Sequence, residues 1–452
     1  MEYTPVDSGQ AQRVRDLDRD HVLHSWSVQS QINPIPVAGA EGRYFWDYDG
    51  KRYLDFSSQL VNLNLGHQHP RLVEAIVEQA RKLCTIAPSV ACEPRSELAR
   101  LLTEVTPGSM QAAFFTNGGA EANENAVKIA RWYTGRDKVI VRYRSYHGAT
   151  AGAITLTGDP RRWYAEPGMP GVVRMFDPYT YRCPAGHPDP CPVCSGGPHL
   201  EEIVQYEGPD KVAAVILETV TGTNGIIVPP DGYLKSIREV CDTYGILLIF
   251  DEVMAGFGRT GTWFACEHWD VVPDIMTVAK GINSGYVPLG ALVVSEPINA
   301  WLQDKYLAGG LTYSGHPLAC AAGVASIGVF RQEKVVENAA AMGDVLAAEL
   351  PKLAARHASI GETRGLGLFW GLELVRSRAT REPLVPFNAV GEANTPMARL
   401  TKAAMERGLF LMTHFNVVMI CPPLTITREE LREGLTMLDE VLSVADEYAV
   451  EG

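Results

Sequence analysis

One lysine, Lys280, ends the apolar segment 273–280 and is followed at once by a glycine-containing turn. Lysine is seldom buried, because burial strips water from its ammonium group; the same loss lowers the pKa and makes the amine nucleophilic. Such an amine forms Schiff bases with aldehydes. An isolated lysine more often lays its stem on apolar surface while its head reaches water, so this interpretation depends on other residues.

An acidic residue, Asp251, stands at the end of the apolar run 246–251. Ligand sites of α/β proteins form just beyond the carboxyl ends of buried strands, and a carboxylate there needs a cationic partner. A protonated pyridine nitrogen is one such partner, because the charged ring then acts as an electron sink. A helix cap or a structural ion pair would also explain an acid at this position.

Two adjacent glycines, Gly118 and Gly119, separate a strand-like start from a helical pattern in segment 114–131. Glycine lets the backbone approach a ligand closely, and the N–H groups at the start of the following helix attract anions. The segment is therefore a candidate phosphate cradle. An ordinary glycine turn before a helix has the same pattern.

The elements that must position these residues alternate between apolar runs and amphipathic stretches, which predicts an α/β fold with a mostly parallel sheet. The clearest strands are 212–218, 246–251 and 291–295. After Gly323 the chain becomes alanine-rich, and a Gly-rich strand over 362–374 follows. A last helix carries one apolar face, formed by Leu431, Leu435, Leu438 and Leu442.

We predict three regions from this pattern. Residues 61–330 form a large cofactor-binding domain, residues 331–452 form a smaller α/β domain, and residues 1–60 form an N-terminal arm that packs with the small domain. A chain of 452 residues is long enough for two domains of this kind.

Composition excludes several classes of protein. The 40 basic and 53 acidic residues give a net charge of −13, the wrong sign for binding nucleic acid or anionic lipid. No apolar run approaches the roughly 20 residues that cross a membrane, and the N-terminus lacks the apolar core of a signal peptide. We therefore expect no nucleic acid or membrane partner and a cytoplasmic location.

Six motifs occur in order along the chain: TNGGAE at 116–121, YHG at 146–148, FDEV at 250–253, GFGRTG at 256–261, AKG at 279–281 and TYSGHP at 312–317. Together they resemble the signature of class III (omega) aminotransferases, which are pyridoxal-phosphate enzymes of fold type I. The resemblance extends from about Trp26 to Thr427 and so covers nearly the whole chain.

The resemblance implies a role for each matched residue. Lys280 forms the Schiff base with pyridoxal 5′-phosphate, Asp251 pairs with the pyridine nitrogen, and Glu218 helps to order Asp251. The ring lies between Val253 and Tyr146, while the phosphate is held by Gly118, Gly119 and Ala120, with His147 in a supporting role.

Thr312 matches a family threonine that reaches the phosphate of the neighbouring subunit. The resemblance therefore implies a homodimer, with tetramers left open. No metal is implied.

The implied reaction is a ping-pong transfer of an amino group to pyruvate or 2-oxoglutarate, in which Lys280 also moves the proton. The donor is an omega-amino acid, taurine or a primary amine. A lyase or decarboxylase on the same scaffold is the alternative. A ligand-sensing transcription regulator is disfavoured by the negative charge and by the lack of an N-terminal DNA-binding region.

The substrate pocket departs from several relatives. Where those acting on β-alanine or aromatic amines read SGLWCVN, this chain has SQLVN at 58–62, so Val61 is expected to replace a bulky tryptophan. The arginine that often precedes the PPL segment is absent. His414 or Asn416 could donate to an acid group instead, although a polar turn between two strands is the preferred interpretation of both residues. We expect Trp26, Leu60, Val61 and His414 in this pocket.

Three of the nine cysteines cluster with a histidine in the pattern Cys183, His187, Cys191 and Cys194. Thiolate and imidazole ligands suit tetrahedral zinc, and the C-x2-C spacing is typical of half a zinc site. The four residues lie within twelve positions, however, which is tighter than the usual two pairs. A Pro-rich surface loop with reduced thiols is the preferred interpretation at this level.

Overall fold

The computed structural model describes residues 8–186 and 191–450, so His187, the histidine of the alternative zinc site, lies outside the described residues. Its centre is a seven-stranded sheet in the order β4-β10-β9-β8-β7-β5-β6. In that order the strands are Met110–Thr116, Gly290–Ser295, Ile275–Val278, Leu247–Asp251, Val212–Glu218, Lys138–Arg142 and Val172–Met175.

Strands β6, β5, β7, β8 and β9 run parallel, whereas β10 is antiparallel to both β9 and β4. The prediction of a mostly parallel sheet is thus confirmed. The register pairs Glu218 with Asp251 and Asp251 with Thr277, so three strands end side by side. Lys280 follows Thr277 by three residues and therefore emerges beside both acids.

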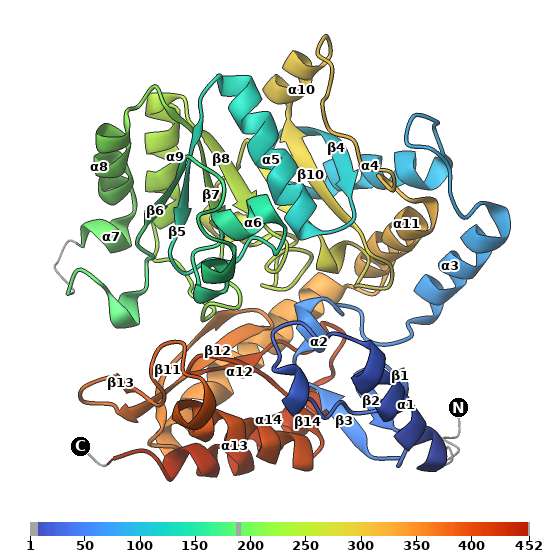
Figure 1. Ribbon diagram of the computed structural model, residues 1–452, viewed down its shortest axis with the longest axis vertical. Coiled ribbons are helices and arrows are strands. Elements are labelled where there is room, and N and C mark those ends of the chain that lie inside the picture. Colours follow the sequence, from blue (N-terminus) through green and yellow to red (C-terminus); the bar gives the residue numbers. More distant parts are fainter. Residues whose placement is uncertain (1–7, 187–190, 451–452) are drawn as a thin grey trace.

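Helices cover both faces of this sheet (Figure 1). Alternate residues of β7 show why: Val215 and Leu217 join one apolar core, while Ala214 and Ile216 join a second core on the other face. The helices of this region are α3 Pro70–Lys82, α4 Glu93–Val105, α5 Gly119–Thr134, α6 Ala151–Leu156, α7 Pro192–Ser195, α8 Gly197–Glu207, α9 Tyr233–Tyr244, α10 Glu296–Leu302 and α11 Pro317–Gln332.

The N-terminal and C-terminal parts of the chain share one sheet, in the order β1-β2-β3-β14. These strands are Val37–Glu41, Tyr44–Asp47, Arg52–Asp55 and Leu409–Phe410, and β14 pairs in parallel with β3. Figure 1 shows the two ends of the chain below the large sheet. This pairing supports the predicted packing of the N-terminal arm with the small domain; the limits at residues 60 and 330 stay predictions.

The rest of the C-terminal region contains a sheet in the order β11-β12-β16-β15, with β13 on β12. Its strands are Ile360–Leu366, Phe369–Ser377, Val417–Ile420, Met412–His414 and Glu382–Pro383. Its helices are α12 Val335–Arg356, α13 Thr395–Glu406 and α14 Arg428–Asp446. At the N-terminus α1 spans Ser8–His21 and α2 spans Ser58–Val61.

The single strand predicted over 362–374 is a hairpin of β11 and β12. Gly367 turns the chain with a φ of 53°, a conformation that glycine adopts without strain. The predicted final helix is confirmed as α14, which begins with a capping box between Thr427 and Glu430.

A buried arginine, Arg259 of the GFGRTG motif, joins the large domain to both neighbouring regions. Its guanidinium donates to the carbonyl oxygens of Leu368 and Pro422 at 3.1 and 2.6 Å. It also donates to Ser58 Oγ and Asn64 Oδ1, both at 3.1 Å. Burial lowers the pKa of Arg259 to about 10, so the group is still charged at neutral pH. The motif residue thus fixes the placement of three chain segments.

Across residues 8–186 and 191–450, no helix has the length and apolar character that a membrane crossing requires.

Candidate active site

A cavity of about 640 Å³ lies beyond the ends of β7, β8 and β9 and contains most of the predicted residues. Its volume is in the range of small-molecule sites. It is lined by Trp26, Leu60, Gly119, Ala120, Asn123, Tyr146, His147, Gly148, Ala149, Arg161, Glu218, Thr223, Asp251, Val253, Met254, Lys280, Met412, Thr413 and His414. The N-terminal arm, the large domain and the small domain therefore all contribute walls.

Lys280 begins the turn after β9 and adopts a φ of 41°. This left-handed conformation is costly for a residue with a side chain and is typical of functional sites. Burial lowers the pKa of Lys280 to about 8, although Asp251 and Glu218 act to raise it. No described residue forms a hydrogen bond or ion pair with its Nζ. With a pKa of about 8, far more of the amine is neutral at physiological pH than in an ordinary lysine, and this fraction is available for reaction.

Asp251 is held by three donors. Its Oδ2 accepts from Asn123 Nδ2 and His147 Nδ1, both at 2.8 Å, and its Oδ1 accepts from the backbone N–H of Val253 at 3.0 Å. The residue is only 3% exposed. A carboxylate has about four acceptor positions, so one is left for a donor in the cavity.

Glu218 lies beside this group at the end of β7. Its two carboxylate oxygens accept from the backbone N–H groups of Tyr146 and Gly222 at 3.0 and 2.7 Å. Burial raises the pKa of Glu218, and the neighbouring Asp251 raises it further. Glu218 therefore anchors the segment that carries Tyr146 and His147.

The glycine turn brings helix α5 close to the residue after Asp251. A Cβ atom at Gly119 would lie 2.9 Å from both methyl groups of Val253, so only glycine fits there. A Cβ at Gly118 would meet no atom within 4 Å. Gly119 and Ala120 of the first turn of α5 line the cavity, and the unpaired N–H groups of a helix start attract an anion.

These features fit pyridoxal 5′-phosphate. The helix start suits the phosphate, the free acceptor position on Asp251 suits a ring nitrogen, and Val253 provides an apolar wall. The unpartnered amine of Lys280 suits the aldehyde. The sequence had not indicated Asn123, whose Oδ1 also accepts from Thr277 Oγ1 at 2.6 Å, because its contact with Asp251 spans distant segments.

An arginine that the sequence had not indicated, Arg161, also lines this cavity. Its guanidinium lies 3.9 Å from the ring centre of Tyr146 and 5.5 Å from that of Trp26. Nε donates to Asp159, and Nη2 donates to Thr223 Oγ1 at 2.8 Å. No described residue accepts a hydrogen bond from Nη1. The DPRRW segment had no recognisable motif, so only the tertiary structure reveals this cation.

The predicted substrate residues divide into two groups. Trp26, Leu60 and His414 line the cavity, whereas Val61 is 1% exposed and packs in the apolar core. Positive φ angles at Ser58, Gln59 and Val61 turn the chain there, so Leu60 lines the pocket and Val61 does not.

His414 and Asn416, the two alternative acid-binding residues, differ in position. Burial lowers the pKa of His414 to about 4, so this ring is neutral at physiological pH. Asn416 donates to the carbonyl oxygen of Leu374 at 2.7 Å and is not among the cavity residues. Asn416 therefore has a structural partner and no place in the site.

Thr312 is exposed and does not line the cavity of its own chain. A role at the phosphate of this site would therefore require a second chain.

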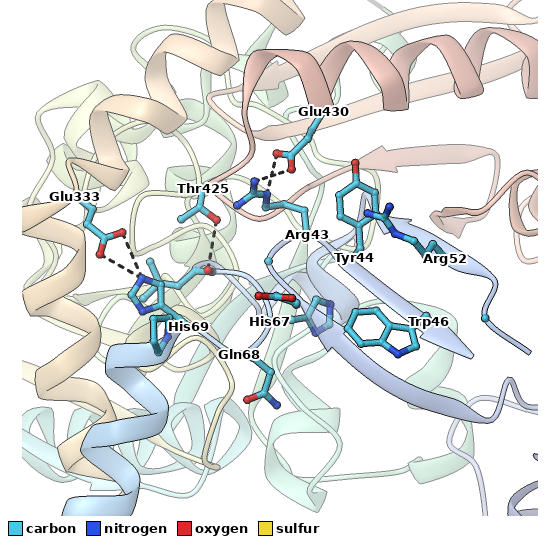
Figure 2. A pocket seen from close by; sticks show the side chains of 15 residues that line it. Arg43, Tyr44, Trp46, Arg52, His67, Gln68, His69, Glu333, Thr425 and Glu430 are labelled. Atoms are coloured by element: carbon cyan, nitrogen blue, oxygen red, sulfur yellow. Dashed lines mark hydrogen bonds and ion pairs between the residues drawn. The ribbon is translucent and has the colours of Figure 1, made fainter. Parts of the chain in front are cut away.

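Another hollow, of about 700 Å³, lies between the N-terminal strands and the C-terminal region (Figure 2). Two ion pairs join side chains of its lining: Arg43 with Glu430 at 2.6 Å and His69 with Glu333 at 3.3 Å. Lys280 and Asp251 are absent from its lining. The chemistry therefore belongs to the cavity around Lys280.

A lysine, a strand-end aspartate and a helix-start glycine turn in a mostly parallel sheet define a pyridoxal-phosphate-dependent transferase of fold type I. The family model Aminotransferase class-III matches residues 26–442, and the chain belongs to this family. It is an aminotransferase, and its cofactor is pyridoxal 5′-phosphate.

Individual relatives cover almost the full length. The chain is 34% identical over 446 residues to the taurine–pyruvate aminotransferase of Bilophila wadsworthia, covering 95% of this chain and 97% of that protein. It is 35% identical to the putrescine–pyruvate aminotransferase of Pseudomonas aeruginosa, covering 94% and 95%.

Among solved structures, the taurine:2-oxoglutarate aminotransferase of Bifidobacterium kashiwanohense, in complex with pyridoxal phosphate and glutamate, is similar. It has a TM-score of 0.92 and 44% identity, and the match covers 99% of both chains.

Proposed function

We propose that this aminotransferase moves the amino group of a small donor with an acid group at its far end, such as taurine or an omega-amino acid, to pyruvate or 2-oxoglutarate. The observation that carries the proposal is that one cavity contains both Lys280, whose amine has a lowered pKa, and the cation Arg161. The taurine substrates in the names of two relatives support it.

The proposal gives each group in the cavity one task. The bound cofactor supplies an aldehyde that takes up amino groups and a ring that accepts electrons from the donor's carbon. Asp251, fixed by Asn123 and His147, holds the ring nitrogen protonated. The backbone at Gly118, Gly119 and Ala120 would hold the phosphate.

Lys280 Nζ has two tasks in this proposal. It would hold the cofactor between reactions, and as a free amine it would take the proton from the donor's carbon and give it up again within the cavity. Its lowered pKa lets the amine accept a proton near neutral pH, and its fixed position removes much of the entropic barrier. Tyr146 and Val253 would hold the ring between them.

Arg161 would bind the acid group of the substrate. A guanidinium matches the geometry of carboxylates and sulfonates, and its Nη1 has no acceptor among the described residues. Asp159 and Thr223 fix the other nitrogens, so the side chain is ordered before the substrate binds. Neutral His414 adds a hydrogen-bonding group to the same wall.

We further propose that the active unit is a homodimer in which Thr312 of each chain completes the other chain's phosphate site. The exposure of Thr312 and of its neighbour Tyr313, which is 60% exposed, supports a contact at this surface. A cytoplasmic location is also proposed, because none of the nine cysteines forms a disulfide in the structure.

The deciding experiment supplies the purified holoenzyme with taurine, an omega-amino acid or a simple alkylamine, each with pyruvate or 2-oxoglutarate. The proposal expects alanine or glutamate to form in equal amount to the oxidised donor, with the acid-bearing donors preferred. Release of ammonia or carbon dioxide without an acceptor would instead favour the lyase or decarboxylase alternative.

A further inference from the structure

Three cysteine sulfurs converge on the large domain, away from the cavity of Lys280. Cys183 follows the short helix Thr180–Arg182, while Cys191 and Cys194 belong to the start and the end of α7. The three Sγ atoms all lie within 4.8 Å of one another. Cys183 Sγ is 3.3 Å from Cys191 Sγ and 3.6 Å from Cys194 Sγ.

This spacing matches a metal site better than a disulfide. A disulfide requires an S–S distance of about 2.0 Å, and no disulfide joins these described cysteines. Thiolates bound to tetrahedral zinc at about 2.3 Å lie about 3.8 Å apart. The two sulfur–sulfur distances given above are close to that value. The short spacing of the cysteines along the chain had instead argued against a metal site.

The backbone of α7 also favours the thiolate form that a metal ion needs. The N–H of Cys194 donates to Cys191 Sγ at 3.3 Å, which stabilises negative charge on that sulfur. Cys183 is 8% exposed, so its thiolate would be poorly hydrated without a cation.

We propose that Cys183, Cys191 and Cys194 bind one structural Zn²⁺ ion. The ion replaces the protons of the three thiols, which leave to solvent, and each sulfur donates an electron pair to the metal. No redox change is involved. The fourth position is open to a water molecule, and the proposal depends only on the three sulfurs.

The position of the site gives the metal a structural purpose. Next to Cys183, Arg182 forms an ion pair with Glu373 of β12 in the small domain. At the other side, Ser236 of α9 accepts from the N–H of Gly197, just beyond α7, at 2.9 Å. A zinc ion would therefore tie the segment that contacts the small domain to the helices on the large sheet.

The test measures zinc in the purified, tag-free holoenzyme by mass spectrometry of the metal. We expect about one ion per chain. The triple variant Cys183→Ser, Cys191→Ser, Cys194→Ser should lose at least tenfold, whereas the exposed control Cys84→Ser should keep the wild-type content. Equal zinc in all three proteins would overturn the proposal.

A second measurement does not depend on the variant folding. Wild-type holoenzyme is treated with a chelator, and its unfolding temperature is followed as Zn²⁺ alone is added back. The proposal expects the unfolding temperature to fall and then recover. An unchanged unfolding temperature with no zinc uptake would overturn it. So would an intact mass lower by two hydrogen atoms, which shows a disulfide among the three cysteines.

Discussion

His147 Nδ1 lies 2.8 Å from Asp251 Oδ2, and both side chains are buried. The same carboxylate oxygen accepts from Asn123 at 2.8 Å, so Asp251 cannot turn away from the cavity. An acid that is fixed in this way presents its remaining acceptor position in one direction. The arrangement explains why an aspartate at this strand end can control a ring nitrogen.

The variant Asp251→Asn should keep the shape of the site and remove its charge. We expect kcat to fall by on the order of 10²-fold or more, as when other preorganised electrostatic contacts are removed. Steady-state kinetics with a fixed donor and acceptor measure the effect. Asp231→Asn, on an exposed loop, is the matched control and should leave kcat unchanged.

Capture of pyridoxal phosphate by the cofactor-free protein should depend on pH through Lys280. Only the neutral amine reacts, so the rate should rise as pH increases through about 8, well below the ordinary lysine value of 10.5. The rate is measured from the appearance of the visible absorbance band. The same reaction with Nα-acetyl-lysine, whose side-chain amine is free, serves to correct for ionisation of the cofactor.

The carboxylate of Asp251 acts to raise the pKa of Lys280. In Asp251→Asn the midpoint of the capture rate should therefore move to lower pH. A midpoint that stays near the ordinary lysine value in both proteins would contradict the proposed burial of the amine.

The variant Arg161→Met should raise KM for acid-bearing donors by about 10- to 100-fold, equivalent to the roughly 1.5–3 kcal/mol of hydrogen bonds to charged groups. An alkylamine without an acid group should react at its wild-type rate when the first half-reaction is followed by loss of the cofactor's visible band. Arg162→Met removes the neighbouring charge, which pairs with Glu166 outside the cavity, and serves as control.

Arg161→Lys should recover part of the lost affinity, because it restores the charge without the planar fork. Equal losses for acid-bearing donors and alkylamines would mean that Arg161 acts through Tyr146 and not through the acid group. Cofactor affinity measured in the same variants separates these two effects.

The variant Arg259→Met should lower the free energy of unfolding by about 2–4 kcal/mol, because buried oxygens at Leu368 and Pro422 lose their donor. Calorimetry of the holoenzyme should show a lower unfolding temperature. Arg81→Met on the exposed side of α3 is the control and should have little effect. Similar unfolding temperatures for both variants would contradict the joining role of Arg259.

The sequence by itself determined the chemistry-bearing residues that lie inside ordered motifs. Lys280, Asp251 and Gly119 each stand next to a strongly apolar strand or at a helix start, and local periodicity places such positions at the carboxyl edge of a parallel sheet. The strands 212–218 and 246–251 were predictable for the same reason: residues buried on both faces read as continuous apolar runs.

Tertiary structure alone decided the residues whose role depends on segments far apart in the chain. Arg161 and Asn123 reach the cavity from a short helix and from α5, and no local pattern records those contacts. Of the two neighbours predicted for the pocket wall, Leu60 lines it and Val61 does not, because backbone turns redirect the side chains there. The three cysteines cluster in the sequence, but only the fold brings their sulfur atoms within 4.8 Å of one another, because the segment with Cys183 lies against α7.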